Sequence, residues 1–294
     1  WIVQRTGISE RRLAAEDQAT SDLAVAAARD ALESAGMEAG ELDAVLVATC
    51  TPDHLFPATG CLVQAALGAH NAMACDLEAA CSGFLYGFAW GAGMIASGMV
   101  RNVLLIGAET LSRFTDYTDR RTCILFGDAA GAAILRPAQQ GGELIYTELG
   151  ADGSWPELLV IPAGAARTPA SHDTVDGAAH YMQLRGRDVF KLAVNKLTEL
   201  LERLPESAGV GLDAIEMVIP HQSNVRIINS AFARSGLDVG KAYMNIDRVG
   251  NTSAASIPVA MVQAVAEGKL RRGDLVLFLA FGGGLTWGAS LIRY

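Results

Sequence analysis

The chain has 294 residues, of which 51% are hydrophobic, and it carries a formal net charge of −9 at neutral pH. Its length and hydrophobic content suffice for one large domain or two medium ones, and no apolar run reaches the roughly 18 residues that would span a bilayer. We therefore expect a cytoplasmic protein with no membrane partner. The acidic balance also argues against nucleic-acid binding, which depends on clustered Lys and Arg side chains that neutralise phosphates.

The first half of the chain alternates helical and strand patterns. Residues 21–35 place small and apolar side chains near helical spacing, and Ser21 is a suitable N-cap. Residues 44–49 form a short apolar block, typical of a strand that is buried on both faces. The pattern continues with a helix ending near residue 67, a strand at 72–75, a helix at 82–97 and a strand at 103–106. Such alternation predicts a parallel sheet.

The second half repeats this order. A helical pattern at 189–204 precedes strands at 217–219 and 273–278, and Gly-rich segments close both halves, at 127–131 and 282–284. We predict an α/β protein built from two duplicated halves. They comprise residues 1–150 and 186–294, with an irregular connection at 151–185.

Three polar residues follow predicted strands. Cys81 and Asn251 are assigned corresponding positions, each after the second strand of its half and before a helix, and His221 follows the first strand of the second half. Ligands bind at the carboxyl ends of parallel strands, so all three can face one crevice. The start of a helix favours a thiolate at Cys81. The glycines at 282–284 expose backbone N–H groups that can approach a reacting carbonyl.

Each of these residues alone has a structural explanation. A cysteine in an apolar protein is usually a small buried side chain, a histidine is often packed or caps a helix, and an asparagine suits a turn. The five cysteines form no Cys-x-x-Cys pair and no ordered series with histidine, so we expect neither disulfides nor a metal site. Only the combination of the three residues indicates covalent acyl transfer.

The motifs themselves resemble a known family. They occupy residues 76–84, 220–224, 250–258 and 281–288, and the opening residues 1–8 match as well. Together they resemble β-ketoacyl-acyl-carrier-protein synthase III, in order and over essentially the whole chain. The resemblance implies a thiolase-like fold with layered αβαβα architecture. The family has a further strand before the position of Trp1, so we expect the sheet of the first half to be incomplete here.

The resemblance also implies a reaction in two steps. Cys81 takes the acyl group from a short acyl-CoA primer, with the backbone N–H groups of Cys81 and Gly283 as the oxyanion hole. Malonyl-acyl carrier protein then loses CO2, and His221 and Asn251 stabilise the enolate that attacks the acyl-enzyme. The products are 3-oxoacyl-acyl carrier protein, CoA and CO2, which initiates fatty acid synthesis. Neither a metal nor a redox cofactor is required.

Binding roles are implied in the same way. The family is a homodimer in which Phe56 of one subunit closes the acyl pocket of the other. The implied CoA-binding residues are Trp1, Arg5, Arg120 and Asn224. The implied acyl pocket consists of Phe56, Leu111, Phe126, Leu158 and Phe190, whose bulky side chains favour a short primer. The implied docking residues for the acidic carrier protein are Lys191, Arg226 and Arg234.

Other functions remain open at this level. The nearest is a starter-loading or acyl-transfer enzyme of the same fold in polyketide or specialised metabolism. A biosynthetic thiolase would carry a second catalytic cysteine near the C-terminus, and no cysteine follows Cys123. A hydroxymethylglutaryl-CoA synthase would need a catalytic glutamate, for which the sequence offers no convincing candidate. A non-catalytic acyl-CoA-binding homologue would not need the three polar residues.

Overall fold

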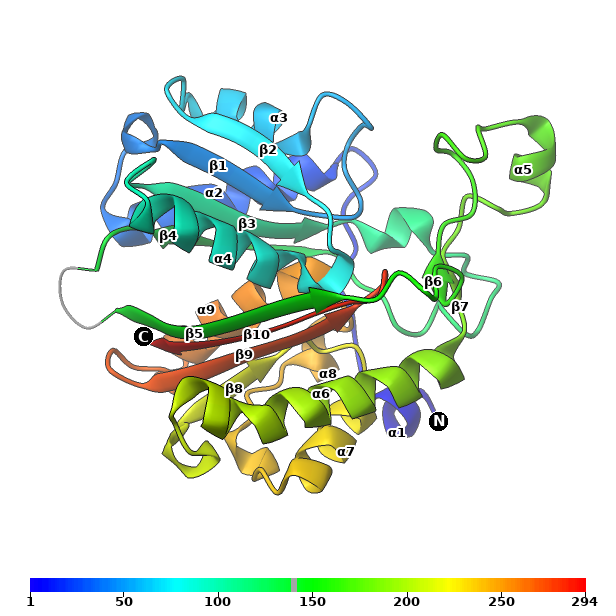
Figure 1. Ribbon diagram of the computed structural model, residues 1–294. Coiled ribbons are helices and arrows are strands. Elements are labelled where there is room, and N and C mark those ends of the chain that lie inside the picture. Colours follow the sequence, from blue (N-terminus) through cyan, green and yellow to red (C-terminus); the bar gives the residue numbers. More distant parts are fainter. Residues whose placement is uncertain (139–141) are drawn as a thin grey trace.

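The chain folds into two mixed sheets that pack face to face through helices (Figure 1). A computed structural model describes residues 1–138 and 142–294. In the first sheet, with the order β2-β1-β3-β4, the first three strands are parallel and β4 is antiparallel to β3. Its strands are β1 (Ala44–Ala48), β2 (Met73–Leu77), β3 (Val103–Glu109) and β4 (Ala129–Leu135). Its helices are α2 (Thr20–Ala35), α3 (Thr59–Leu67) and α4 (Gly83–Ala96).

The second sheet has the order β5-β10-β9-β8. Here β8 is parallel to β9, and β10 is antiparallel to both of its neighbours. Its strands are β5 (Glu143–Ala151), β8 (Met217–Pro220), β9 (Leu275–Gly282) and β10 (Thr286–Arg293). Its helices are α6 (Gly186–Ala208), α7 (Val225–Ser235) and α9 (Ser256–Ala266).

The predicted duplication is confirmed by the strand order, because β1, β3 and β4 are related to one another as β8, β9 and β10 are. The two sheets differ at the edge beyond these strands. β5 pairs with β10, whereas β4 pairs only with β3 among the described residues. The sequence-based boundary at residue 150 places β5 with the first half, but its hydrogen bonds belong to the second sheet.

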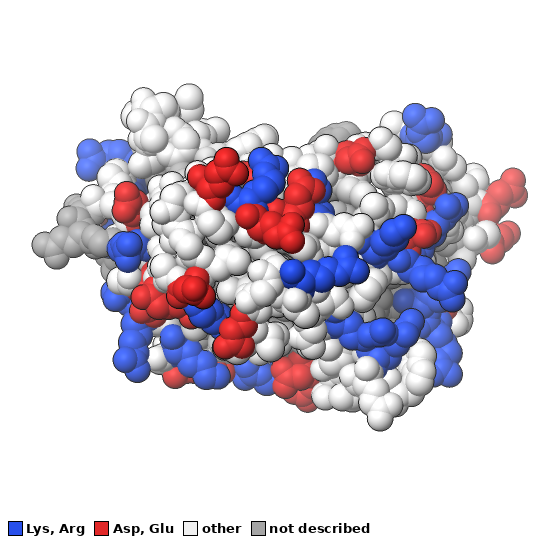
Figure 2. Space-filling model, turned by 60° about the horizontal axis from the view of Figure 1, so that its bottom comes forward, with Lys and Arg blue, Asp and Glu red and all other residues white. Residues whose placement is uncertain are grey.

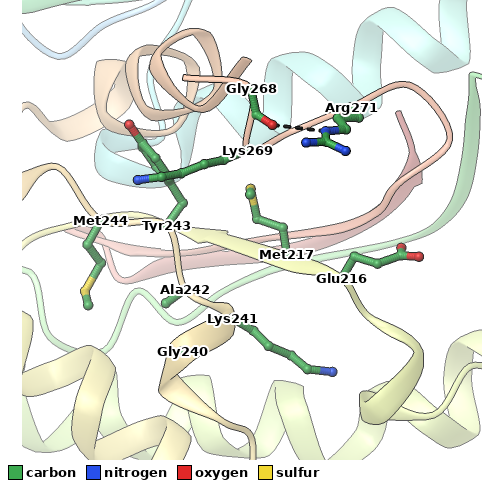
Figure 3. A pocket seen from close by; sticks show the side chains of 10 residues that line it. All are labelled: Glu216, Met217, Gly240, Lys241, Ala242, Tyr243, Met244, Gly268, Lys269 and Arg271. Atoms are coloured by element: carbon green, nitrogen blue, oxygen red, sulfur yellow. Dashed lines mark hydrogen bonds between the residues drawn. The ribbon is translucent and has the colours of Figure 1, made fainter. Parts of the chain in front are cut away.

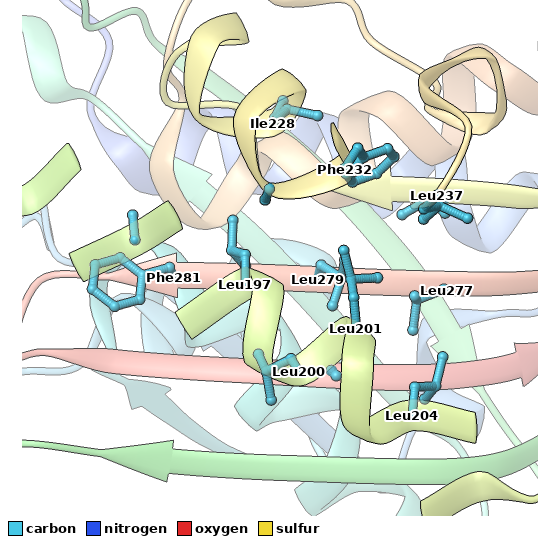
Figure 4. Close-up of a cluster of buried hydrophobic side chains, with 14 of the residues drawn as sticks. Leu197, Leu200, Leu201, Leu204, Ile228, Phe232, Leu237, Leu277, Leu279 and Phe281 are labelled. Carbon is cyan, nitrogen blue, oxygen red and sulfur yellow. The ribbon is translucent and has the colours of Figure 1, made fainter. Parts of the chain in front are cut away.

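Alternating side chains of the central strands form three cores, which define five layers. Leu104 and Ile106 of β3 pack against α2, while Leu105 between them joins the core that holds α4 and α9. The outer face of the second sheet packs against α6 and α7, where Figure 4 shows Leu277 and Leu279 of β9 beneath the leucines of α6. Full burial of one such side chain contributes about 1.5–3 kcal/mol. This is the predicted αβαβα architecture.

The connection between β5 and α6 projects from the layered body on the side that carries the N-terminus (Figure 1). Within loops it contains the short pair β6 (Leu159–Val160) and β7 (Gln183–Leu184) and the helix α5 (His172–Asp176). Two further short helices are α1 (Ile2–Thr6) and α8 (Ile246–Val249). None of the helices in the described ranges combines the length and apolar character needed to cross a membrane.

Candidate active site

The carboxyl ends of the two sheets bring the three predicted polar residues together. Cys81 lies in a one-turn 3-10 helix, Ala80–Ser82, that leads into α4, and a second such turn, Ser253–Ala255, leads into α9. These two turns contact each other across the pseudo-symmetric centre of the molecule. His221 directly follows β8, and its backbone N–H donates to the carbonyl of Leu279 at 2.6 Å.

The two turns show how far the duplication extends. Ala80 and Ser253 both open their turns with positive φ, 45° and 46°. This backbone conformation is unusual for residues other than glycine, and its repetition identifies the two residues as counterparts. Cys81 therefore corresponds to Ala254 and not to Asn251, which lies three positions earlier. The sequence-based pairing of Cys81 with Asn251 is wrong by three residues, because α8 and its following loop occupy the second half at this point.

The predicted nucleophile is a buried thiol, with 7% of Cys81 exposed. Burial raises the pKa of Cys81 to about 12, and the negative charge of Glu109 raises it further. The Ser253 side chain and the backbone N–H groups of Gly283 and Cys81 itself act in the opposite direction. The donors at the start of the helix act in the expected direction, towards the thiolate, but they compensate only part of the desolvation.

The imidazole of His221 is also buried. Its Nδ1 lies 2.7 Å from the hydroxyl of Ser256, while Nε2 has no hydrogen-bond partner among the described residues. Burial lowers the pKa of His221 to about 4, although the Ser253 carbonyl favours the protonated form. His221 is therefore neutral near pH 7, and an unpartnered buried nitrogen is available to a substrate.

Backbone hydrogen bonds fix the position of Asn251. Its N–H donates to the carbonyl of Leu125 at 2.9 Å, and its carbonyl accepts from the N–H of Gly127 at 2.9 Å. The side-chain oxygen accepts from the N–H of Ser253 at 2.9 Å. With Oδ1 engaged in this turn, the amide nitrogen Nδ2 is the group of Asn251 that can donate to a ligand.

The glycines at the end of β9 leave room for the nucleophile. A Cβ atom on Gly282 would lie 2.7 Å from the backbone nitrogen of Cys81 and 3.1 Å from that of Ser82. Gly283 follows directly, and its N–H lies close enough to Cys81 to lower the pKa of the thiol. The predicted oxyanion hole, Cys81 and Gly283, is thus brought together at one point.

The four predicted CoA-binding residues form two neighbouring pairs. The guanidinium carbon of Arg120 lies 5.5 Å from the ring centroid of Trp1, whose side chain is 68% exposed. Asn224, the N-cap of α7, donates from Nδ2 to the carbonyl of Arg5 at 3.4 Å. Arg5 belongs to α1, which follows Trp1 directly and packs against α7.

Four of the five predicted acyl-pocket residues are buried or partly buried. Leu111 and Phe126 share a small buried cluster, while Leu158 and Phe190 pack at the large core beneath α6. The fifth, Phe56, lies in the loop that follows β1 and is 85% exposed.

The three predicted docking residues are exposed on adjacent helices, Lys191 on α6 and Arg226 and Arg234 on α7. Arg234 donates to the side chain of Asn195 at 2.9 Å, and the guanidinium of Arg226 lies 5.8 Å from the ring centroid of Phe190. Figure 2 shows Lys and Arg side chains towards both ends of this face, and one group of them lies at the right-hand end, the end that carries α1 in Figure 1.

Three residues near the nucleophile were missed by the sequence reasoning: Glu109, Ser253 and Ser256. Glu109 ends β3 and is fully buried beside Cys50, and the other two belong to the turn that leads into α9. A signal was available for Glu109, since an acid at the carboxyl end of an apolar strand lies on the same edge as the other polar residues.

A separate pocket of about 600 Å³ lies at the other end of the second sheet (Figure 3). It is lined by Met217, which begins β8, and by Lys241, Tyr243 and Lys269 among others. Since His221 follows the opposite end of β8, this pocket is not part of the site around Cys81.

The fold and site define an acyl-transferring condensing enzyme of the thiolase type, with a buried cysteine and neutral histidine and asparagine donors at the meeting point of two duplicated halves. Comparisons with known proteins agree. Residues 75–153 match the family of 3-oxoacyl-[acyl-carrier-protein] synthase III, and residues 206–294 match its C-terminal part. The chain is 49% identical to the beta-ketoacyl-[acyl-carrier-protein] synthase III of Desulfitobacterium hafniense and 48% identical to that of Clostridioides difficile, in each case over 100% of this chain and 89% of the relative. The chain belongs to the β-ketoacyl-[acyl-carrier-protein] synthase III family.

Solved structures extend the comparison. The 3-oxoacyl-[acyl-carrier-protein] synthase III of Aquifex aeolicus superposes with a TM-score of 0.91 at 45% identity, covering 100% of this chain and 90% of that one. The priming β-ketosynthase of the R1128 polyketide pathway gives 0.90 at 33% identity, covering 99% and 87%. OleA of Xanthomonas campestris, at 20% identity, a TM-score of 0.85 and coverage of 98% and 86%, shares the fold.

Proposed function

We propose that Cys81, His221 and Asn251 carry out the decarboxylative condensation of a short acyl-CoA primer with malonyl-acyl carrier protein. The observation that carries this proposal is the unpartnered Nε2 of a neutral, buried His221 in the site that also contains Cys81 and the free amide of Asn251. A step that builds negative charge on oxygen needs donors that do not lose their protons, and these two groups are such donors.

In the first half-reaction, the sulfur of Cys81 forms a bond to the acyl carbon and the thioester bond to CoA breaks. The thiol proton leaves Cys81, and the departing CoA thiolate is protonated to the free thiol, so atoms and charge balance. The N–H groups of Cys81 and Gly283 stabilise the oxyanion of the tetrahedral intermediate. Because burial keeps the thiol protonated at rest, ionisation of Cys81 accompanies substrate binding.

In the second half-reaction, the bond between the malonyl carboxylate and its α-carbon breaks, and CO2 leaves. The electron pair is delocalised onto the thioester oxygen, where Nε2 of His221 and Nδ2 of Asn251 donate hydrogen bonds. The resulting carbon nucleophile attacks the acyl group on Cys81, whose sulfur departs as the product forms. We assign the imidazole tautomer with the proton on Nε2, because the hydroxyl of Ser256 can donate to Nδ1.

Substrate binding follows from the surroundings of the site. Trp1 and Arg120 hold the adenine of CoA between them, and Arg5 and Asn224 lie along the path of the pantetheine arm. Their clustering at the end of the molecule that carries α1 supports these roles. Lys191, Arg226 and Arg234 dock the acidic carrier protein, supported by the basic side chains gathered at the same end (Figure 2).

The acyl pocket is completed in a homodimer. Phe56 and its neighbour Leu55 are 85% and 77% exposed, a degree that is unusual for two adjacent apolar side chains and suits a loop inserted into a second subunit. There Phe56 closes the pocket formed by Leu111, Phe126, Leu158 and Phe190 and limits the primer to a short chain. We place the enzyme in the cytoplasm, where its CoA and carrier substrates are found.

The choice between primary and specialised metabolism rests on similarity. Identities of 48–49% to fatty acid enzymes exceed the 33% identity to the priming ketosynthase of a polyketide pathway. We therefore favour initiation of fatty acid synthesis over starter loading for a polyketide.

The test separates the two half-reactions. Incubation with acyl-CoA alone should add one acyl group, detected by intact mass spectrometry and mapped to the peptide containing Cys81, and Cys81→Ser should abolish this label. His221→Ala and Asn251→Ala should retain the label but lose release of radiolabelled CO2 from malonyl carrier by about 10²- to 10³-fold, the usual effect of losing one such donor. A label on another cysteine, or full CO2 release in either alanine variant, contradicts the assignment.

A further inference from the structure

Glu109 is a buried acid whose charge acts on the proposed nucleophile, Cys81. It ends β3 with none of its surface exposed, and none of the ion pairs formed by the described residues includes it. A buried carboxylate without a cation is costly unless its oxygens are fully hydrogen-bonded. The hydrogen-bond donors around the carboxylate of Glu109 must therefore offset the cost of burying it.

Within the described parts of the chain, the hydrogen-bond partners of the Glu109 carboxylate are donors. The backbone N–H groups of Cys50 and Ala254 lie at 3.1 Å and 3.4 Å, and the hydroxyls of Thr51 and Thr49 lie at 2.7 Å and 3.2 Å. Each hydroxyl also accepts a backbone N–H, which leaves its own hydrogen free for Glu109. Burial raises the pKa of Glu109, but a site made of donors favours the carboxylate.

These donors come from both halves of the chain. Residues 49–51 follow β1, whereas Ala254 belongs to the turn that leads into α9. Ser253, which precedes Ala254 in this turn with φ of 46°, donates its N–H to the side chain of Asn251. Its hydroxyl lies 3.9 Å from the sulfur of Cys50 and close enough to lower the pKa of both Glu109 and Cys81.

We infer that Glu109 is a positioning residue of the active site, whose buried carboxylate joins the loop after β1 to the Ser253–Ala255 turn and thereby fixes Ser253 and Asn251 beside Cys81. Two consequences follow. The turn keeps Asn251 in the orientation that leaves its amide free, and the fixed charge controls how readily the thiol of Cys81 ionises. The first consequence rests on the proposed function, and the second does not.

The negative charge of Glu109 acts on the pKa of Cys81 in a defined direction. The ionisable groups that interact electrostatically with Cys81 are Glu109 from β3 and Cys50 from the loop after β1. His221, from the loop after β8, is neutral and adds no charge to the site. The negative charge of Glu109 raises the pKa of Cys81, whereas the hydroxyl of Ser253 lowers it. Removing each group should therefore change the reactivity of the thiol in opposite directions.

The experiment measures the rate of Cys81 alkylation by iodoacetamide between about pH 7 and about pH 10, with peptide mass mapping to separate Cys81 from Cys50. Glu109→Gln should react about three- to tenfold faster than the wild type at a given pH, which corresponds to a pKa about half a unit to one unit lower. Ser253→Ala should react more slowly. Glu109→Asp, which retains the charge, should stay closer to the wild type than Glu109→Gln.

The serine variant is a matched control for folding. Its counterpart in the first half is an alanine, Ala80, with nearly the same positive φ. Ser253→Ala should therefore introduce no new backbone strain. A purely structural role for Glu109 would change both variants in the same direction. Equal alkylation rates for the wild type and Glu109→Gln, or a change in the same direction in both variants, would overturn the inference.

A second measurement addresses Asn251. Release of CO2 from malonyl carrier by the acylated enzyme should fall about tenfold in Glu109→Gln, since a displaced turn misaligns a donor. An unchanged CO2 release in a folded Glu109→Gln enzyme would refute the positioning of Asn251. Absence of CO2 release from the wild type would instead refute the proposed function, while the alkylation result would stand.

Discussion

Gly282 provides a test of the oxyanion hole that changes no functional group. In Gly282→Ala, the new Cβ would lie 2.7 Å from the backbone nitrogen of Cys81 and 3.0 Å from the hydroxyl of Thr286. Ordinary contacts begin at about 3.5 Å, so the end of β9 and the turn carrying Cys81 must separate by close to 1 Å. Because the crowded atom is a backbone nitrogen in a packed turn, no flexible side chain can absorb this shift.

The expected loss can be worked out from the same geometry. A displacement near 1 Å costs about 10²-fold in rate, and loss of one oxyanion donor costs about 10²- to 10³-fold. Overpacking should also lower the free energy of unfolding by about 1–3 kcal/mol. We expect Gly282→Ala to acylate Cys81 about 10²- to 10³-fold more slowly than the wild type, measured by intact mass spectrometry over time with a saturating acyl-CoA.

Gly283→Ala is the matched control. Its Cβ would come no closer than 3.3 Å, to the terminal Cδ2 of Leu159, which can move, and its N–H is retained. It should acylate within about tenfold of the wild type. Thermal unfolding of both variants, followed by circular dichroism, shows that the comparison is made between folded proteins. A folded Gly282→Ala enzyme that acylates as fast as Gly283→Ala would refute the placement of the oxyanion hole.

Three further predictions concern the carrier, the primer and pH. Arg226→Glu should raise the KM for malonyl carrier and leave acyl-CoA loading unchanged. Salt should weaken binding of the carrier to the wild type, because it screens the charges. Unchanged carrier kinetics in charge reversals of Lys191, Arg226 and Arg234 would place docking elsewhere. The wild type should load acyl chains beyond about eight carbons poorly, because extra methylenes strain a packed pocket by about 1–3 kcal/mol. Phe56→Thr should accept longer acyl chains than the wild type. A wild type that prefers long-chain or aromatic primers contradicts this. Because burial lowers the pKa of His221 to about 4, CO2 release by the acylated enzyme should show no fall as the pH drops through the ordinary histidine range near 6.5. Near pH 6.5, His221 takes up a proton in the unfolded chain but not in the folded one, so it lowers the free energy of unfolding as the pH falls from about 6.5 to about 4. A drop in CO2 release centred near pH 6.5 would show that His221 is not buried in this way.

Part of the order of elements could be read from the sequence, where a short apolar strand precedes a helical pattern. The strands β4, β5 and β10 were not predicted, and their antiparallel pairing makes both sheets mixed where parallel sheets were expected. Residues 44–48 and 103–106 are buried along their whole length, which is why they appear as uninterrupted apolar blocks. Cys81 and His221 could be placed near one another for a related reason, because they follow β2 and β8 and parallel strands end at one edge of a sheet. Asn251 follows the helix α8, so the expectation that it follows a strand is wrong and its position depends on tertiary contacts.

Other features depend on contacts between distant segments and could be decided only by the tertiary structure. The sheet to which β5 belongs is set by its hydrogen bonds with β10, far away in the chain. The pKa of Cys81 is set by burial between the two halves, which outweighs the favourable start of a helix. The sequence could place Glu109 at the carboxyl end of a strand, but it could not show which groups would contact the carboxylate. Its role depends on donors more than fifty residues before it and more than a hundred after it, which only the packing of the two sheets brings to one carboxylate.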